Sequence, residues 1–297
     1  MTILFNPWYG CTKVSAGCLH CYAETMMADR FHKVIWGPKG TRRRTNQKLW
    51  KDVIDWNADA ILKQERRKVF MASLADMFED FKGALVNPRL LDGDRLRAFT
   101  GPRPGPMLSD ALRFWRDAAF LVVDECQWLD FLVLTKRPEN IPAMLSGIGK
   151  NGGYRHNVWL GTSISEQRDA VKQIPDLLKA KHLCRYVFLS VEPQLEDIDL
   201  TPWLGALDWV IVGGESDQGA GKARVFNINW ARKILRQCRQ HNVSCFIKQL
   251  GSNIVAPTMS DPGKHLALKD SHGGDWNEWP SDLKVRDCPE NYYPNFA

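Results

Sequence analysis

The sequence has no long hydrophobic run. None of its apolar stretches reaches the roughly 18 to 20 residues that a membrane-spanning helix needs, and its start lacks a basic region followed by an apolar run. Internal repeats and low-complexity tracts are also missing, which argues against repeat and fibrous proteins. We therefore expect a soluble, cytoplasmic protein without membrane association.

A fourth cysteine is missing where a four-thiol site would need one. Three of the eight cysteines, Cys11, Cys18 and Cys21, occur within eleven residues, and the other five are scattered at positions 126, 184, 238, 245 and 288. In a reducing compartment the scattered cysteines are expected to be buried small apolar residues rather than disulfides. The three clustered cysteines need a different explanation, because a structural zinc site or a simple electron-transfer cluster uses four ligands.

The charge is mildly positive, with a formal net charge of +6 over 297 residues. Basic residues gather at Lys39–Arg44 and Lys63–Lys68, which suits a polyanionic partner such as nucleic acid; a solvated surface is the alternative. There are twelve tryptophans, and several of them, such as Trp36, Trp50 and Trp56, lie near basic residues. Such rings stack on nucleobases, or they pack in the core.

Short β-branched and aromatic runs recur, each followed by a turn and a helix-like stretch, which is the pattern of repeated βα units. The candidate strands are Ile3–Asn6, Val69–Ser73, Phe131–Thr135, Val158–Thr162, Tyr186–Val191, Trp209–Gly213 and Cys245–Lys248. Amphipathic helices are predicted at Ala111–Trp128 and Asn229–His241. The pattern predicts an α/β fold with a partial or closed (βα)6–7 TIM-like barrel. A doubly wound sheet stays possible, because periodicity does not report closure.

Two segments depart from this pattern. Leu91–Met107 carries several Gly, Pro and Arg residues without a clean period, so we expect an insertion near residues 82–108 of a barrel spanning 1–250. The chain after Gly251 is irregular too, and residues 251–297 are expected to form a C-terminal extension that packs on the barrel. We expect a monomer.

The motif Cys11-x6-Cys18-x2-Cys21 follows the first candidate strand. Three thiolates ligate three irons of a cubane cluster and leave the fourth iron open, as a cofactor that chelates iron requires. The alternative is a zinc site completed by His20 or His32. Chelation by His20 would be strained, because His20 lies between two of the proposed ligands.

Three cysteines after the first strand of a predicted (βα) barrel resemble the radical S-adenosylmethionine (radical SAM) superfamily. The commoner spacing there is C-x3-C-x2-C, and His20 stands where that superfamily usually has an aromatic residue. Over most of its length the chain is also similar to the phage Gp37/Gp68-like proteins, the three-cysteine-motif family. This second resemblance is carried by the NPW-x-GC-x6-C-x2-CYA opening, Ser73-x2-Asp76-x-Phe78, Leu134–Pro138, Gly161–Ser163, Ser190–Pro193, Gly213–Ser216 and Lys248-Gln249-x-Gly251.

The resemblance implies a [4Fe–4S] cluster on Cys11, Cys18 and Cys21, with S-adenosylmethionine as a second cofactor and flavodoxin or ferredoxin as electron donor. The reaction it implies is reductive cleavage of S-adenosylmethionine to a 5′-deoxyadenosyl radical. The expected substrate is a nucleobase, in DNA or as a free nucleotide, and the expected reaction is hypermodification of phage DNA thymidine in the host cytoplasm, such as isomerisation of an amino-acid-decorated thymidine. The alternatives are a DNA photoproduct repair lyase and a non-catalytic zinc or iron–sulfur nucleic-acid-binding module.

Polar residues follow most of the candidate strands, at the end where a βα barrel builds its active site. The expected cofactor-binding residues are Tyr22, Ser73, Asp76, Thr162, Ser163 and Glu192. The expected substrate-binding residues are Lys136, Arg137, Arg224 and Gln249, with Arg42, Arg43 and Arg44 on the DNA backbone. Lys248 and Glu215 are the expected catalytic residues. Helix capping by Asp76 and surface salt bridges of Lys136 and Arg137 are the structural alternatives.

Overall fold

The computed structural model describes residues 3–86, 111–145, 153–217 and 222–289. The chain forms two compact units. The first comprises Met1–Lys13, Ala23–Trp159 and His182–Arg185, and the second comprises Val14–Tyr22, Leu160–Lys181 and Tyr186–Ala297. The expected insertion lies outside the described residues from residue 87 on, and the expected division at residue 250 stays a prediction.

Buried strands form the centre of the first unit. In spatial order they are β1 (Ile3–Phe5), β4 (Arg67–Met71), β6 (Leu129–Thr135) and the first half of β7 (Arg155–Ile164). The pairings of β4 with β1 and β6 are parallel, and nearly every residue of β6 is buried, as expected where both faces of a sheet are covered. The helices of this unit are α1 (Tyr22–Glu24, whose first residue belongs to the second unit), a π-helix at Thr25–Arg30, α2 (Gln47–Lys63), α4 (Arg113–Glu125) and α5 (Ile141–Leu145).

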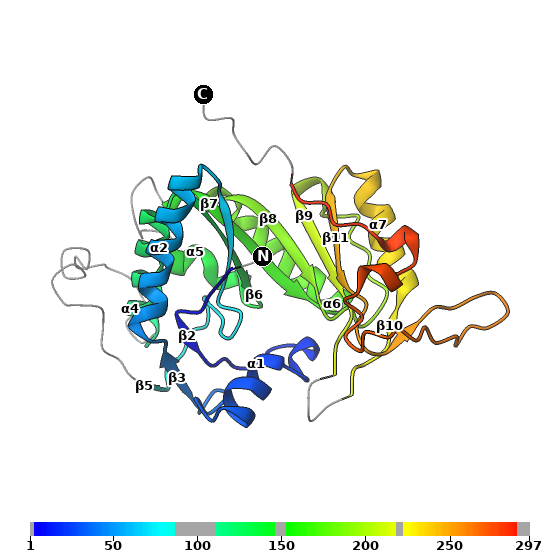
Figure 1. The fold of residues 1–297 in the computed structure, drawn as a ribbon, viewed down its shortest axis with the longest axis horizontal. Helices are drawn as coiled ribbons and strands as arrows, with labels where there is room; N and C mark the ends of the chain where they lie inside the picture. The colour runs from blue at the N-terminus through cyan, green and yellow to red at the C-terminus, as the bar shows by residue number, and fades with distance from the viewer. Residues whose placement is uncertain (1–2, 87–110, 146–152, 218–221, 290–297) are drawn as a thin grey trace. The chain divides into compact units, whose positions relative to one another are not determined.

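Helix α2 shows how the sequence sets the ends of an element. Asn46 caps its start, where the side-chain oxygen accepts a hydrogen bond from a first-turn amide at 3.0 Å. Gln64 adopts a left-handed conformation with φ of 54° and ends the helix. Trp50, Val53 and Ala60 share one face and are buried, and α2 packs against α4, β1 and β6 (Figure 1).

A second, three-stranded sheet of the first unit contains β2 (Trp8–Tyr9), β3 (Thr41–Arg44) and β5 (Ala84–Val86). Strand β2 runs antiparallel to β3, and β5 runs parallel to it. The side chains of β3 alternate, so that Arg42 and Arg44 are buried while Arg43 is half-exposed. The basic run is therefore not the exposed patch expected from the sequence, because the strand turns two of its three arginines inward.

The second unit contains the rest of β7, β8 (Cys184–Val191, whose first two residues belong to the first unit), β9 (Trp209–Gly213) and β11 (Ser244–Gln249), in that spatial order. The pairings of β9 with β8 and β11 are parallel, and α7 (Ile228–Gln240) packs on β9 and β11 (Figure 1). The other regular elements of the second unit are α6 (Gln167–Lys179), β10 (Phe226–Asn227), β12 (Ile254–Val255) and short 3-10 helices at Ala16–Cys18, Leu204–Ala206, Trp276–Glu278 and Ser281–Leu283. A 3-10 helix at Pro138–Asn140 belongs to the first unit, and one at Lys181–Leu183 has its first residue in the second unit and the other two in the first.

The chain after residue 250 lies along the edge of this second group of strands. The amide of Ile247 donates to the carbonyl of Val285, and the amide of Asp287 donates to the carbonyl of Cys245, both at 2.9 Å. Between them, the Arg286 guanidinium lies 4.8 Å from the centre of the Trp276 ring. These contacts cover the backbone of β11, which would otherwise present unpaired groups.

The prediction of an α/β fold with parallel strands is confirmed. All seven expected strands are present, and the strand order is β1-β4-β6-β7-β8-β9-β11. Among the described strands β1 and β11 each pair with one neighbour, so the sheet is not closed. No helix in the described part of the chain combines the length and the apolar character needed to cross a membrane.

Candidate functional site

Cys11, Cys18 and Cys21 lie on the segment that follows β2. Cys11 belongs to the first unit, whereas Cys18 and Cys21 belong to the second. None of the three cysteines forms a disulfide bond, and all three residues are of intermediate exposure. The scattered cysteines form no disulfide bonds either, and the expectation of burial is confirmed for Cys126, Cys184, Cys238 and Cys245, while Cys288 is half-buried. Within the described ranges no three His, Cys, Asp or Glu side chains form a group that could hold a metal ion, so the ligand set stays a prediction.

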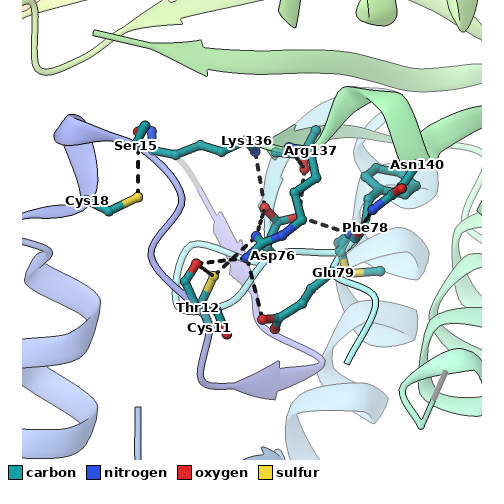
Figure 2. Close-up of polar contacts among 12 residues, drawn as sticks. Cys11, Thr12, Ser15, Cys18, Asp76, Phe78, Glu79, Lys136, Arg137 and Asn140 are labelled. Carbon is teal, nitrogen blue, oxygen red and sulfur yellow. Dashed lines mark hydrogen bonds and ion pairs between the residues drawn. The ribbon is translucent and has the colours of Figure 1, made fainter. Parts of the chain in front are cut away.

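In the first unit, a buried guanidinium lies against Cys11. Arg137 Nη1 is 3.6 Å from the Cys11 sulfur, and Nη2 donates to the carbonyl oxygen of Thr12 at 2.8 Å (Figure 2). Arg137 itself is held by an ion pair with Asp76 at 2.8 Å. The expected substrate-binding arginine is only 8% exposed, and its donors point to the cysteine segment rather than to solvent.

The Asp76 carboxylate is fully occupied. It accepts hydrogen bonds from the Thr135 hydroxyl at 2.7 Å, from Arg137, and from the backbone amides of Phe78 and Lys136. Asp76 is buried and lies among donors that satisfy both oxygens, so its acceptor positions are occupied by groups of the protein itself. The bond to the amide two residues on is the local turn that favours aspartate at such positions.

A second buried ion pair supports the same segment. Arg42 donates to both carboxylate oxygens of Glu79 at 2.7 Å and to the Thr12 hydroxyl at 2.8 Å. Arg137 Nη2 also lies 3.5 Å from Glu79. Arg42 is completely buried, so its charge is not available to a DNA backbone. Two buried arginines, each paired with a carboxylate, thus contact Cys11 and Thr12.

Burial and these charges together determine the pKa values of Cys11 and Arg137. Burial, followed by the negative charges of Asp76 and Glu79, raises the pKa of the Cys11 thiol well above its usual range. Burial lowers the pKa of Arg137, but the negative charges of Asp76 and Glu79 outweigh burial and raise it. At neutral pH Cys11 is therefore a neutral thiol beside a permanent cation.

In the second unit, Glu215 and Arg224 hold the segment on both sides of Cys18. Arg224 pairs with Glu215 through Nη2 at 2.6 Å and Nε at 2.9 Å, and its Nη1 donates to the carbonyl oxygen of Ala16 at 2.9 Å. His20 Nδ1 lies 3.1 Å from Glu215 Oε2. The Glu215 carboxylate and Arg224 therefore position the cysteine segment, a role that the sequence did not indicate.

The Glu215 carboxylate also makes stability depend on pH. Burial raises its pKa, but hydrogen bonds from Arg224 and His20 outweigh burial and lower it below the usual 4.5. A depressed pKa contributes stability that is complete above the unfolded-state value and is lost as the pH falls. We expect the difference in unfolding free energy between wild type and Glu215→Gln to shrink below about pH 4.5. Urea unfolding at about pH 7, 5 and 3.5 tests this, and an unchanged difference would contradict it.

The glycines before Glu215 allow two parts of the chain to approach. A Cβ atom on Gly214 would lie 2.1 Å from the carbonyl oxygen of Leu250, a backbone atom that cannot rotate away. We expect Gly214→Ala to lower the free energy of unfolding by about 1 to 3 kcal/mol. Gly205→Ala is the matched control, because nothing lies within 4 Å of its added methyl group, and we expect it to change stability by less than about 1 kcal/mol. Equal effects in urea unfolding would refute this explanation.

Lys248 and Glu192 form an ion pair at the ends of β11 and β8. The Lys248 ammonium lies 2.8 and 2.9 Å from the two Glu192 oxygens, and the Ser163 hydroxyl donates to the Glu192 carbonyl at 3.3 Å. Burial lowers the pKa of Lys248, but the charges of Glu192 and Tyr22 outweigh it and raise it. Lys248 is therefore a stable cation at neutral pH, which makes it a weak proton donor.

The remaining expected residues lie in several places. Thr162 donates to Gln173 at 2.6 Å and so faces α6, and Ser73 bonds to Asn6 at 3.2 Å. Gln249 bonds to Gly214 and Ser216 in the second unit. Sequence reasoning missed Glu79, although an acidic residue three positions after Asp76 was a visible partner for the basic run.

One family model matches the chain, over residues 2–86 and 109–280, and its description reads "Protein of unknown function (DUF5131)". The chain belongs to this family. The matched residues include the cysteine segment, Asp76, Glu79, Arg137, Glu215 and Arg224, whereas residues 87–108, which overlap the expected insertion, fall outside the match. No curated protein and no solved structure is significantly similar to the chain.

Proposed function

We propose that this DUF5131 protein is a radical SAM enzyme that holds a [4Fe–4S] cluster through Cys11, Cys18 and Cys21 and modifies a nucleobase. The observation that carries the proposal is the cysteine segment, which has three cysteines within eleven residues, none of them in a disulfide bond. A three-thiolate set leaves one iron open for a second ligand. A partial barrel of radical SAM type belongs to the same proposal, and the parallel strands β4, β6, β8 and β9 support it.

The donor groups around the thiols suit an iron–sulfur cluster. Arg137 is placed to donate to the Cys11 sulfur, and the Ser15 hydroxyl lies 3.8 Å from the Cys18 sulfur (Figure 2). Hydrogen bonds to ligand sulfurs tune the potential of such clusters. Each thiol must lose its proton to bind iron, and the Arg137 charge offsets the cost of a thiolate at Cys11.

In this proposal the role of the buried polar residues near the thiols is to position the cysteine segment rather than to transfer protons. Asp76 orients Arg137 against Cys11, and Glu215 orients Arg224 and His20 on either side of Cys18. When bound, the cluster and S-adenosylmethionine supply the reductive cleavage that initiates hydrogen abstraction. The proposal includes flavodoxin or ferredoxin as the source of the electron.

The substrate in this proposal is thymidine of phage DNA, hypermodified by isomerisation or a related rearrangement. We assign cofactor contacts to Tyr22, Ser163 and Glu192, all three of which belong to the second unit. The half-exposed side chains of Lys136 and Gln249 are assigned to the substrate. Arg43, which is half-exposed between two buried arginines, is assigned to the DNA backbone.

Anaerobic reconstitution with iron and sulfide, followed by reductant and S-adenosylmethionine, tests the proposal. We expect iron and sulfide to bind and 5′-deoxyadenosine to form. Tightly bound zinc with persistent absence of 5′-deoxyadenosine would defeat it. Phage DNA that carries modified thymidine is the expected substrate, and turnover of irradiated DNA in its place would instead identify a repair lyase.

A further inference from the structure

Two buried hydrogen-bond donors of the first unit have no acceptor among the residues that the structure describes. The indole Nε1 of Trp8 and Nη2 of Arg44 are both buried, and neither is hydrogen-bonded in the part of the chain that the structure describes. Trp8 is fully buried, and Arg44 is 8% exposed. Arg42, two residues earlier on the same strand, differs sharply, because its Nε and Nη2 donate to the two carboxylate oxygens of Glu79.

The two donors share one face of a sheet. Trp8 lies directly opposite Arg44 in the antiparallel pairing of β2 and β3. Side chains at opposite positions project to the same side, with Cβ atoms about 4.5 to 5.5 Å apart. The indole N–H and the guanidinium thus belong to neighbouring side chains on the same face of the sheet.

The surroundings of Arg44 are aromatic rather than acidic. Its guanidinium lies 4.4 Å from the centre of the Trp50 ring, and Trp8 packs on Trp115 at 6.4 Å. Desolvation lowers the pKa of Arg44, the direction expected for a cation buried without a carboxylate. Among the described residues no ion pair compensates its charge. An aromatic face attracts the cation but accepts no hydrogen bond of ordinary strength.

We propose that Trp8 and Arg44 form a binding site for an oxyanion, the carboxylate or phosphoryl group of a small ligand. A buried cation and a buried donor without acceptors are costly, and an anion that accepts from both removes that cost. The planar guanidinium also offers paired donors that match carboxylate and phosphate oxygens. The site does not depend on the proposed cluster.

Thermal unfolding of the full chain in a buffer free of oxyanions, with inorganic phosphate added at constant ionic strength, is the first test. We expect a saturable rise in Tm of about 2 to 4 °C. Arg44→Met should abolish the rise, whereas Lys51→Met, which removes a charge from an exposed position beside Trp50, should retain it. Wild type that shows no rise, or a rise that Arg44→Met retains, overturns the proposal.

A spectroscopic measurement on folded wild type removes the dependence on how well a variant folds. In protein labelled with 15N at tryptophan, the indole N–H signal that is missing in Trp8→Phe should shift on phosphate addition. Thymidine monophosphate and acetate distinguish the sources of the group: tenfold tighter binding of the nucleotide indicates a phosphate ester, and tighter binding of acetate indicates a carboxylate. A Trp8 signal that none of the three moves overturns the proposal.

Discussion

Replacing Cys18 with alanine is expected to abolish both the visible absorbance of the reconstituted cluster and the formation of 5′-deoxyadenosine. Loss of an outer partner of a metal ligand already costs about 10- to 100-fold in affinity or activity, so loss of the ligand itself is expected to cost more than about 100-fold. Absorbance, iron content and product are each measured after anaerobic reconstitution. The same loss is expected for Cys11→Ala and Cys21→Ala.

The control for this prediction is Cys288→Ala, which removes a half-buried thiol outside the cysteine segment. It should bind iron and form product as wild type does. Cys18 is partly exposed, and its sulfur lies 3.8 Å from Ser15, so the unreconstituted Cys18→Ala protein should unfold within about 0.5 kcal/mol of wild type. Retained cluster absorbance in Cys18→Ala would rule out Cys18 as a ligand.

Replacing Glu79 with glutamine is expected to lower the free energy of unfolding by about 3 to 5 kcal/mol. The carboxylate is 3% exposed and pairs with a completely buried Arg42, so the substitution leaves that cation without a counter-charge. Arg137, 3.5 Å from the same carboxylate, loses part of its compensation as well. Urea unfolding at neutral pH measures the change.

The matched control is Asp52→Asn, which removes the carboxylate of the Lys48–Asp52 pair. The lysine of that pair is 80% exposed, and exposed pairs contribute about 0.5 kcal/mol or less. The double substitution Arg42→Met with Glu79→Met should recover much of the loss, because it removes both charges together. A loss in Glu79→Gln no larger than in Asp52→Asn would show that the buried pair does not stabilise the first unit.

Much of the fold could be predicted because buried parallel strands are visible in the sequence as short apolar runs. Runs such as Phe131–Thr135 and Trp209–Gly213 are apolar on both faces, and a strand is present at each. The start of β4 was less visible, because the strand begins at Arg67 and includes Lys68, two charged residues that apolar runs do not reveal. Hydropathy therefore located the strands better than it located their ends.

The partners of the polar residues could not be predicted in the same way. Arg137 and Asp76 follow different strands, and the ion pair between them joins residues 61 positions apart. Sequence reasoning assigned the first to substrate and the second to a cofactor, because it could see the strand ends but not which side chains are buried there. Burial decides the partners of these two residues, since a carboxylate nearby stabilises a buried guanidinium.

The run Thr41–Arg44 shows the same limit. Three consecutive arginines are typical of an exposed basic surface, yet a strand alternates its side chains and turns Arg42 and Arg44 inward. Glu79, 37 residues later, then compensates one of them, whereas Arg44 lies over Trp50.

The sequence by itself determined the α/β class, the positions of seven strands and the three clustered thiols, because these depend on local composition and spacing. Only the tertiary structure decided which charges lie beside the thiols: Arg137 at Cys11, with Glu79 and Arg42 behind it, and Arg224 with Glu215 around Cys18. The physical reason is that a buried charge is stabilised by partners distant in the chain, and the fold alone brings those partners within hydrogen-bond distance.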